Sequence, residues 1–439
     1  MRSRNRIPDR NGNGSPLPPP EESPARTLTF RFRESFKWKQ AFHALRYPNY
    51  RLWFWGQVIS LFGTWMQLTA QGFLIYELTH SPAYLGYTAF AAGVPTWLFM
   101  LYGGVLADRI HRRTLLIITQ IAMMVLAVVL ALLTFLGIVE AWHIVLLAFG
   151  LGIATAFDAP ARQAFVQELV DREDMPNAIA MNSAMFNLAT SLGPGVSGVI
   201  YVLVGPAWCF IINAVSYLAI IVALAAMRLQ PLPPAEHRHP AGVELWEGIR
   251  FLRGHAMIKT LISIVAVTCF FGLSFATLIP AWAVKILGGD ATTNGMLQSF
   301  RGFGAFCGAL MIASLGRFQF KGRLLTVGGF AFPLLLLSFG VFHQLVPALV
   351  ILFLIGVSIM LIFNLGNALV QTLVPDKLRG RVMGVYSLAF FGLMPLGALW
   401  VGLLAEHLSE PLAVVINGGI LLVFFVLIRI FVPRIYDLP

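Results

Sequence analysis

Long apolar runs follow one another along this chain, and short polar segments separate them. Each run is long enough to cross about 30 Å of hydrocarbon as an α-helix, which takes about 20 residues. The runs are too long for the strands of a membrane β-barrel, which alternate apolar and polar positions over about ten residues. The pattern therefore predicts twelve membrane-spanning helices: 52–76, 84–106, 115–137, 142–160, 178–204, 206–227, 258–284, 292–315, 324–343, 346–370, 382–405 and 411–433.

The second half of the chain repeats residues of the first half at a constant spacing, as in the pairs Gly193 and Gly397, Gly198 and Gly402, and Asn213 and Asn417. Two similar six-helix bundles in one chain are a transporter architecture, with the substrate site near the membrane midplane between the bundles. We therefore expect an all-α membrane protein with two pseudo-symmetric bundles. The predicted parts are a disordered basic tail (1–46), a first bundle (47–229), a linker with an interfacial helix (230–257) and a second bundle (258–439).

The composition agrees with a membrane protein, because 58% of the 439 residues are hydrophobic and only 12% are charged. A soluble chain has no means to bury that much apolar surface. Cys209, Cys269 and Cys307 all lie in apolar runs, so we expect small core residues, with no disulfide, metal or cofactor.

The net charge of +11 would suggest nucleic acid in a soluble chain, but here its placement predicts membrane topology instead. With the N-terminus inside, every Lys and Arg falls on the cytoplasmic side except Lys285 and Arg301. This asymmetry follows the positive-inside rule and places both termini in the cytoplasm. The tail has no apolar segment of a signal peptide, and it either rests on the anionic inner leaflet or is simply solvated.

A short polar hairpin joins the second and third predicted spans. Its sequence, from Gly103 to Thr114, places an acid four positions after a glycine and close to a basic cluster. This pattern resembles the signature loop between helices 2 and 3 of the Major Facilitator Superfamily. The resemblance implies a cytoplasmic gate made by Gly104, Asp108, Arg109, Arg112 and Arg113.

In that family the acid docks onto the start of helix 11, so the basic turn with Arg379, Gly380 and Arg381 is expected to face Asp108. The alternative is a topogenic basic loop whose aspartate only caps a helix. Near the end of the fourth span, Asp158 and Arg162 have a spacing that permits an ion pair if the helix continues past Pro160. We expect this pair to help close the inner face, and a substrate role is the alternative.

Polar residues form stripes at helical spacing on the first and fifth spans. Because polar groups that face lipid are costly, each stripe should face other helices or water. A stripe of this length favours a water-filled cavity over interhelical hydrogen bonds, which remain the alternative. The candidate cavity residues on these spans are Gln57, Thr64, Gln67, Gln71, Asn187 and Thr190.

The fifth span also contains Gly193, Pro194 and Gly198. A proline inside a helix removes one hydrogen bond, and glycines permit a close neighbour. The position resembles the helix-5 motif of the superfamily's proton-coupled exporters, although only in part. The alternative is an ordinary kinked packing contact.

Arg301 lies midway through the eighth span, where an arginine costs several kcal/mol unless it meets water, an acid or a ligand. It is the best single candidate for contact with an anionic or acceptor-rich substrate. The alternative is a structural role, with carbonyl groups or with Asn364 and Asn367 on the tenth span as partners. Those two asparagines are also candidate cavity residues.

Three stretches, 76–82, 157–177 and 371–384, resemble the branch of the superfamily that contains the enterobactin exporter and the third-subgroup drug–proton antiporters. The resemblance implies export from the bacterial cytoplasm, driven by proton entry. We therefore expect a monomer in the bacterial inner membrane that exports a small amphipathic or anionic molecule, either drug-like or siderophore-like. No carboxylate lies at the centre of a predicted span, so no residue is assigned as the proton carrier.

Other classes of protein fit the sequence less well. A phosphate-binding Gly-x-x-x-x-Gly-Lys-Ser/Thr loop of an ATP-driven pump is absent, and so is the His-Glu-x-x-His motif of a membrane metalloprotease. We therefore expect no enzymatic activity and no nucleic-acid partner, with the lipid bilayer as the surroundings. An importer and a transporter-like sensor without flux remain the alternative functions.

Overall fold

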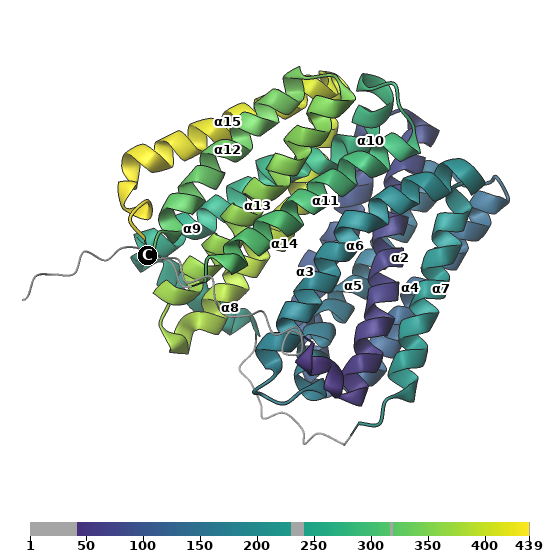
Figure 1. Ribbon diagram of the computed structural model, residues 1–439, viewed down its shortest axis with the longest axis horizontal. Helices are drawn as coiled ribbons and strands as arrows, with labels where there is room; N and C mark the ends of the chain where they lie inside the picture. Colours follow the sequence, from purple (N-terminus) through teal and green to yellow (C-terminus); the bar gives the residue numbers. More distant parts are fainter. Residues whose placement is uncertain (1–41, 230–240, 317–318, 439) are drawn as a thin grey trace, which may run out of the picture. The chain divides into compact units, whose positions relative to one another are not determined.

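The computed structural model describes residues 42–229, 241–316 and 319–438, without the side chains of residues 100, 101, 103–109, 241–245 and 377. Residues 1–41 of the predicted tail and 230–240 of the predicted linker therefore lie outside the described residues. The end of the predicted tail, over 43–46, is described and forms a short 3-10 helix in which Ala44 is buried. Every regular element in the described part of the chain is a helix, which confirms the predicted all-α class. Figure 1 shows their course.

The first half contains one short 3-10 helix and six long helices. Prolines at the first or second position begin α2, α3 and α7, where the missing N–H costs nothing. Gly205, with φ of +95°, separates α6 from α7. The bounds are η1 His43–Arg46, α2 Pro48–Thr79, α3 Pro82–Arg109, α4 Arg112–Phe135, α5 Ala141–Leu169, α6 Met175–Val204 and α7 Pro206–Ala226.

The second half begins with α8 (Ala241–Gly254), at the position of the predicted interfacial helix. Its seventh span consists of α9 Ala256–Val267, η2 Thr268–Gly272, η3 Leu273–Leu278, α10 Ile279–Ala281 and η4 Trp282–Ile286. The remaining elements are α11 Ala291–Ser314, α12 Lys321–Val341, α13 Leu345–Leu373, α14 Asp376–His407, α15 Glu410–Phe431 and η5 Pro433–Ile435.

Eleven stretches of the described chain are helical, long and apolar enough to cross a membrane. They correspond to eleven of the twelve predicted spans. The remaining predicted span, 84–106, falls in α3, and several side chains near the end of α3 are not described. Several helices extend beyond the predicted bounds, most clearly α5, which continues through Pro160 to Leu169.

The predicted span 258–284 lies within a candidate membrane span, Ala256–Ile286, but this span is not one regular α-helix. Two π-helical turns and a 3-10 segment interrupt this span between Thr268 and Ile286. Pro280 has no N–H to donate, so it breaks the regular hydrogen-bond pattern from within. Gly397 of α14 also presses against the Phe270 carbonyl group, which brings a second backbone close to the irregular turns.

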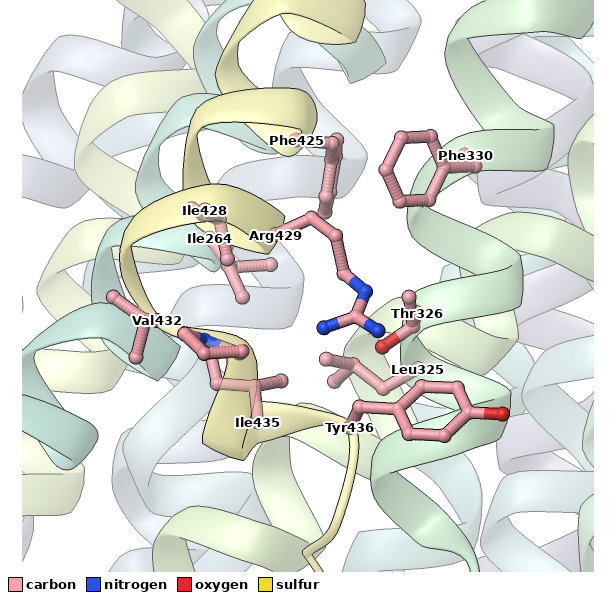
Figure 2. Close-up of a pocket in the computed structure, with 11 residues that line it drawn as sticks. Ile264, Leu325, Thr326, Phe330, Phe425, Ile428, Arg429, Val432, Ile435 and Tyr436 are labelled. Carbon is pink, nitrogen blue, oxygen red and sulfur yellow. The ribbon is translucent and has the colours of Figure 1, made fainter.

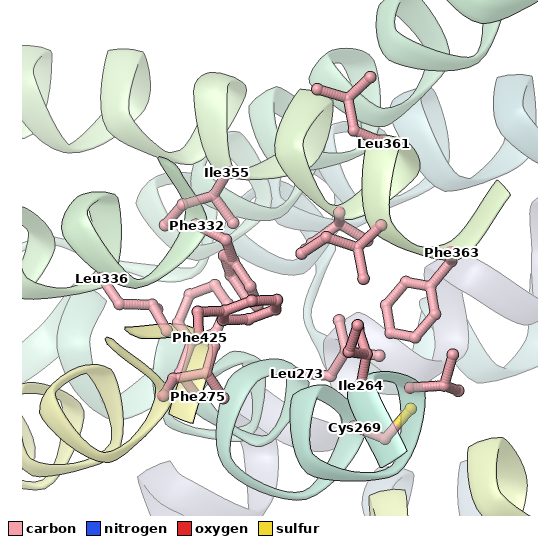
Figure 3. Packing of buried hydrophobic residues seen from close by; sticks show 14 of the residues in the cluster. Ile264, Cys269, Leu273, Phe275, Phe332, Leu336, Ile355, Leu361, Phe363 and Phe425 are labelled. Atoms are coloured by element: carbon pink, nitrogen blue, oxygen red, sulfur yellow. The ribbon is translucent and has the colours of Figure 1, made fainter. Parts of the chain in front are cut away.

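One apolar core lies wholly in the second half and another wholly in the first, while a third joins first-half residues to Ala281 and Ala291 of the second half. In the second half, Phe275, Phe332 and Phe425 pack among the helices that surround the seventh span, as Figure 3 shows. Cys209 and Cys269 are buried, and all three cysteines are free, as expected for small core residues.

Glycines at repeat-related positions make equivalent contacts in the two halves. Gly193 of α6 lies against Trp65 of α2, and Gly397 of α14 lies against Phe270 of the seventh span. Each of these glycines therefore packs on the first long helix of its own half. This correspondence supports the pseudo-symmetry predicted from the sequence repeat.

A second set of glycines brings the two halves together. A Cβ atom on Gly402 of α14 would lie 2.9 Å from Gly86 Cα on α3, and one on Gly198 of α6 would lie 2.5 Å from the Ala291 carbonyl oxygen on α11. The halves therefore meet along two antiparallel helix pairs, α3 with α14 and α6 with α11. Figure 1 shows α11 beside α6.

The two ends of the helices are named here after their loops. The Ser81 end carries the α2–α3 and α14–α15 connections, and the Arg112 end carries the α3–α4 and α13–α14 connections. Gly86, Gly198 and Gly402 all lie toward the Ser81 end. On α14, by contrast, a Cβ atom on Gly380 or Gly384 would meet none of the described atoms within 4 Å, and both glycines lie toward the Arg112 end.

Candidate functional site

Arg301 lies in the middle of α11, one residue before a contact between the halves. A Cβ atom on Gly302 would lie 2.5 Å from the Thr190 carbonyl oxygen of α6. The Nε atom of Arg301 is buried and has no hydrogen-bond partner in the structure as described. Buried polar groups are nearly always paired in proteins, so an unpaired guanidinium nitrogen calls for an explanation.

Two further buried polar atoms on α11, Asn294 Nδ2 and Ser299 Oγ, also have no hydrogen-bond partner among the described residues. Gln298 Nε2 donates to Asn294 Oδ1 at 3.1 Å, so Asn294, Gln298 and Arg301 follow one face of the helix at spacings of four and three. This face of α11 therefore has an excess of hydrogen-bond donors, the chemistry that binds a carboxylate or another oxygen-rich group.

The structural alternative for Arg301 does not appear in the described contacts. Asn367 Oδ1 accepts from Gln371 Nε2 at 2.7 Å, within α13, and Asn364 is exposed. Across the interface, Asn187 Nδ2 donates to the Ser183 carbonyl group and Thr190 Oγ1 donates to the Asn187 carbonyl group, both within α6. The half-buried Asn187 and Thr190 thus stand on the helix that Gly302 touches.

The polar stripe of α2 lies inside the first half. Gln57, Gln67 and Gln71 are buried. Asn213 of α7 donates to Gln67 Oε1 at 2.7 Å, and Thr64 Oγ1 lies 3.4 Å from the Tyr217 hydroxyl group, also on α7. These contacts correspond to the alternative of interhelical hydrogen bonds, and the role of the stripe in a cavity stays a prediction.

Asp158 lies at the centre of a buried polar cluster in the first half. It accepts from Arg162 Nε at 2.9 Å, so the ion pair that the spacing permits does form along a continuous α5. On α4, Thr119 Oγ1 and Gln120 Nε2 also donate to it, at 2.9 and 2.8 Å. Gln57 Oε1 faces Arg162 Nε at 3.2 Å when its amide is oriented to accept.

This cluster joins α2, α4 and α5 of one half. Its described partners include no residue of the second half, so the geometry gives it a role in holding the first half together. Its expected part in closing the inner face stays a prediction.

The predicted gate is only partly within the described structure. Gly104, Asp108 and Arg109 belong to the last turns of α3, and their side chains lie outside the described residues. Arg112 pairs with Glu168 at the end of α5 at 2.6 Å, and Arg113 donates to the Ala225 carbonyl group of α7 at 2.6 Å.

In the second half, Arg379 pairs with Asp376 at 2.5 Å, and Arg381 pairs with Glu247 of α8 at 2.6 Å. A Cβ atom on Gly380 would have no neighbour within 4 Å in the described part of the chain. The described partners of these gate residues therefore lie in their own half, and the proposed contact between Asp108 and α14 remains to be tested.

Figure 2 shows a recess between α12 and α15 that is remote from all the residues predicted for the cavity. It is lined mostly by apolar side chains, with Arg429 at its rim. The Arg429 and Arg323 guanidinium groups lie 5.1 and 5.3 Å from the centre of the Tyr436 ring. We assign it no part in transport.

The Ser81 end holds polar contacts that sequence reasoning missed. Glu406 of α14 accepts hydrogen bonds from Ser81 and Ala83, which belong to the first half. Glu410, wholly buried at the start of α15, pairs with Lys285 at 3.0 Å. The signal for the second pair was Lys285 itself, the one basic residue in a predicted outer loop.

A family model described as "Transmembrane secretion effector" matches residues 39–437. The chain is 24% identical over 360 residues to the staphyloferrin A transporter of Staphylococcus aureus, an alignment that covers 81% of this chain and 89% of that protein. It is 25% identical over 383 residues to the enterobactin exporter of Citrobacter koseri, with 85% and 89% covered.

Among solved structures, the fold is similar to that of a bacterial homologue of the human lysosomal transporter Spinster, in an inward-facing and unoccupied conformation. The TM-score is 0.64 at 14% identity, with 89% of this chain and 96% of that chain covered. This likeness concerns the fold alone, and it agrees with the twelve-helix arrangement predicted from the sequence.

Proposed function

We propose that this chain, which belongs to the transmembrane secretion effector family of the Major Facilitator Superfamily, exports a small anionic or amphipathic molecule by alternating access. The family and the relatives make it a membrane transporter and not an enzyme. The direction, the substrate class and the coupling to protons are our proposals. We place the protein in a bacterial inner membrane as a monomer, with both termini in the cytoplasm.

The single observation that carries the substrate class is Arg301. Its buried Nε has no partner in the described structure, and it stands in mid-span beside the contact between Gly302 and Thr190. A cation kept at this depth without an acid is costly, and a bound anion removes that cost. On the same helix, Asn294 Nδ2 and Ser299 Oγ also lack partners among the described residues, and they would supply a further donor and a hydroxyl group to such a ligand.

The names of two relatives support a siderophore-like substrate, because one is a staphyloferrin A transporter and another an enterobactin exporter. Siderophores carry many oxygen atoms, which suits a site rich in N–H donors. A drug-like amphipathic molecule with an acidic group would satisfy the same chemistry.

The geometry of the halves supports alternating access with the Ser81 end closed. The close contacts of Gly198 and Gly402 and the Glu406 hydrogen bonds lie toward that end, whereas a Cβ atom on Gly380 or Gly384 of α14 would meet none of the described atoms within 4 Å. For the Arg112 end, we propose that Asp108 docks on the start of α14 when that end closes. Proton antiport rests on the resemblance to proton-coupled exporters.

The function is tested by efflux from a bacterial strain that lacks its own exporters. An exporter lowers the cellular content of a siderophore or an acidic dye, and an uncoupler abolishes the effect if protons drive it. Accumulation above the empty-vector level would instead establish an importer. Unchanged content for every solute tested would leave only the sensor.

A further inference from the structure

Glu406, near the end of α14, joins the second half of the protein to the first. Its Oε2 atom accepts from Ser81 Oγ at 2.7 Å and from the Ala83 backbone N–H at 3.2 Å. Ala83 lies in the first turn of α3, where backbone N–H groups have no partner within the helix. Glu406 therefore caps α3 from the opposite half.

The position of Glu406 is unfavourable for its own helix and favourable for α3. It lies in the last turn of α14, where the helix dipole presents partial negative charge. The first turn of α3 presents partial positive charge, which attracts a carboxylate. The side chain is thus stabilised only while the end of α14 stands beside the start of α3.

The other helix pair between the halves, α6 with α11, shows that the fold does not require a cap from the opposite half. In the second half α11 follows the seventh span as α3 follows α2, and Asp290 immediately precedes α11 as Ser81 immediately precedes α3. Asp290 caps α11 from within the second half, accepting from the Thr293 N–H at 3.0 Å. Only α3, of these two helices, receives its acidic cap from the opposite half.

The helix contact beneath the cap is tight, so opening this end must break the cap. Gly402 lies one turn before Glu406, and a Cβ atom there would lie 2.8 Å from the Pro82 carbonyl oxygen. The backbones of α3 and α14 therefore touch directly below the hydrogen bonds. Separation of the two helices would remove both acceptor contacts at once.

We propose that Glu406 is a latch that stabilises the state in which the Ser81 end is closed. It is a positioning residue, since it holds the halves and need not touch the substrate. The inference rests on the alternating access proposed above. Asp108 lies in the last turn of α3, and Glu406 lies in the last turn of α14. If Asp108 docks on the start of α14, each acid of this antiparallel pair caps the first turn of the other helix.

The test measures accessibility at both ends without any substrate, so it is independent of whether transport is observed. A single reporter cysteine is introduced as Ala398→Cys, at a buried position in the closed contact, or as Gly384→Cys, at an open position toward the Arg112 end. Cys209, Cys269 and Cys307 are replaced by serine. The rate of maleimide labelling is measured on the purified full-length protein in lipid nanodiscs.

We expect Glu406→Ala to raise labelling of the Ala398→Cys reporter about fivefold, which corresponds to roughly 1 kcal/mol for an exposed carboxylate at a helix N-terminus. Labelling of the Gly384→Cys reporter should fall, because a shift toward the other state closes that end. Glu406→Gln keeps an acceptor but loses the charge, so its change should be smaller and in the same direction.

The matched control is Glu140→Ala. Glu140 is also an acid at the Ser81 end and caps a helix, but its contacts with Trp142 and His143 lie within the first half. Its removal should leave both labelling rates unchanged. Equal labelling in Glu406→Ala and the unsubstituted protein would overturn the latch, and so would a rise at both reporters, which indicates general loosening.

Discussion

Gly302 of α11 and Thr190 of α6 touch across the two halves, so closely that a Cβ atom on Gly302 would lie 2.5 Å from the Thr190 carbonyl oxygen. Arg301, the residue before Gly302, is therefore held at the level where the halves meet. The contact ties the candidate substrate residue to the interface that has to rearrange during transport.

Gly302→Ala tests this contact. The added methyl group has no room against the α6 backbone, and overpacking of this kind costs about 1–3 kcal/mol. We expect a lower melting temperature in detergent and slower efflux. Gly419→Ala is the control, because a Cβ atom there meets nothing within 4 Å and alanine favours a helix. Equal melting temperatures for the two variants would contradict the described contact.

Arg301→Gln tests the substrate class. The amide keeps a hydrogen-bond donor and loses the charge, so efflux of an acidic siderophore should fall at least about tenfold, the effect of losing one charge-assisted hydrogen bond. Efflux of an uncharged dye should fall less. Arg429→Gln provides the control for a lost arginine, because Arg429 lies in the remote recess between α12 and α15. An equal fall for charged and uncharged solutes would reduce Arg301 to a structural residue.

Asp158→Asn tests the cluster inside the first half. The change leaves the Arg162 guanidinium without its counter-charge. Removal of one partner of a buried ion pair lowers the free energy of unfolding, and we expect a loss of about 3 kcal/mol, the lower end of the usual range. The lower end applies because a quarter of the Arg162 side chain remains exposed. Thermal unfolding should show the loss, and Asp158→Asn with Arg162→Gln should recover part of it. A double variant as unstable as the sum of the single ones would rule out a direct interaction.

Asp174 fastens the short helix η1 to the start of α6 at the Arg112 end. His43 Nδ1 lies 2.8 Å from Asp174 Oδ1, and the Tyr47 hydroxyl group lies 2.8 Å from Oδ2. The hydrogen bond with His43 first, and that from Tyr47 second, lower the pKa of the Asp174 carboxyl group below its ordinary value. A lowered pKa means that this attachment is stabilising above the pKa of the unfolded chain and is lost as the pH falls through the folded pKa.

Hydrogen exchange of residues 43–47 should therefore be slow near neutral pH and should accelerate below about pH 4, near the ordinary pKa of an aspartate. Rates are compared after correction for the intrinsic pH dependence of exchange. In Asp174→Asn, exchange should be fast throughout and its acid-induced step should disappear. Persistence of that step in the variant would assign it to another group.

The membrane-spanning helices could be predicted from the sequence because hydrocarbon thickness fixes the length of an apolar run. The pairing of Asp158 with Arg162 was also accessible, since residues four apart share a helix face. The helical spacing of Gln57, Thr64 and Gln67 in the sequence predicts that they share one face of α2. It did not tell which neighbour that face meets, because the choice depends on how α7 packs.

Contacts between distant segments could not be found in this way. Glu406 and Ser81 are 325 residues apart, and no local pattern links them. The one available signal was an acid in the last turn of a helix, which runs against the usual preference for basic residues there. The irregular turns of the seventh span were likewise hidden, since the close approach of α14 at Phe270 arises only in the folded chain.

The seventh span has one further property that bears on motion. Ala281 belongs to an apolar core of the first half, together with Met66 and Ile75, whereas the adjacent Trp282 belongs to the core of the second half. A displacement of one half against the other therefore has to be absorbed within this span. The π and 3-10 turns between Thr268 and Ile286 already depart from the α-helical pattern. We therefore expect them to act as the hinge, because the backbone there can stretch or rotate with the least loss of regular hydrogen bonds.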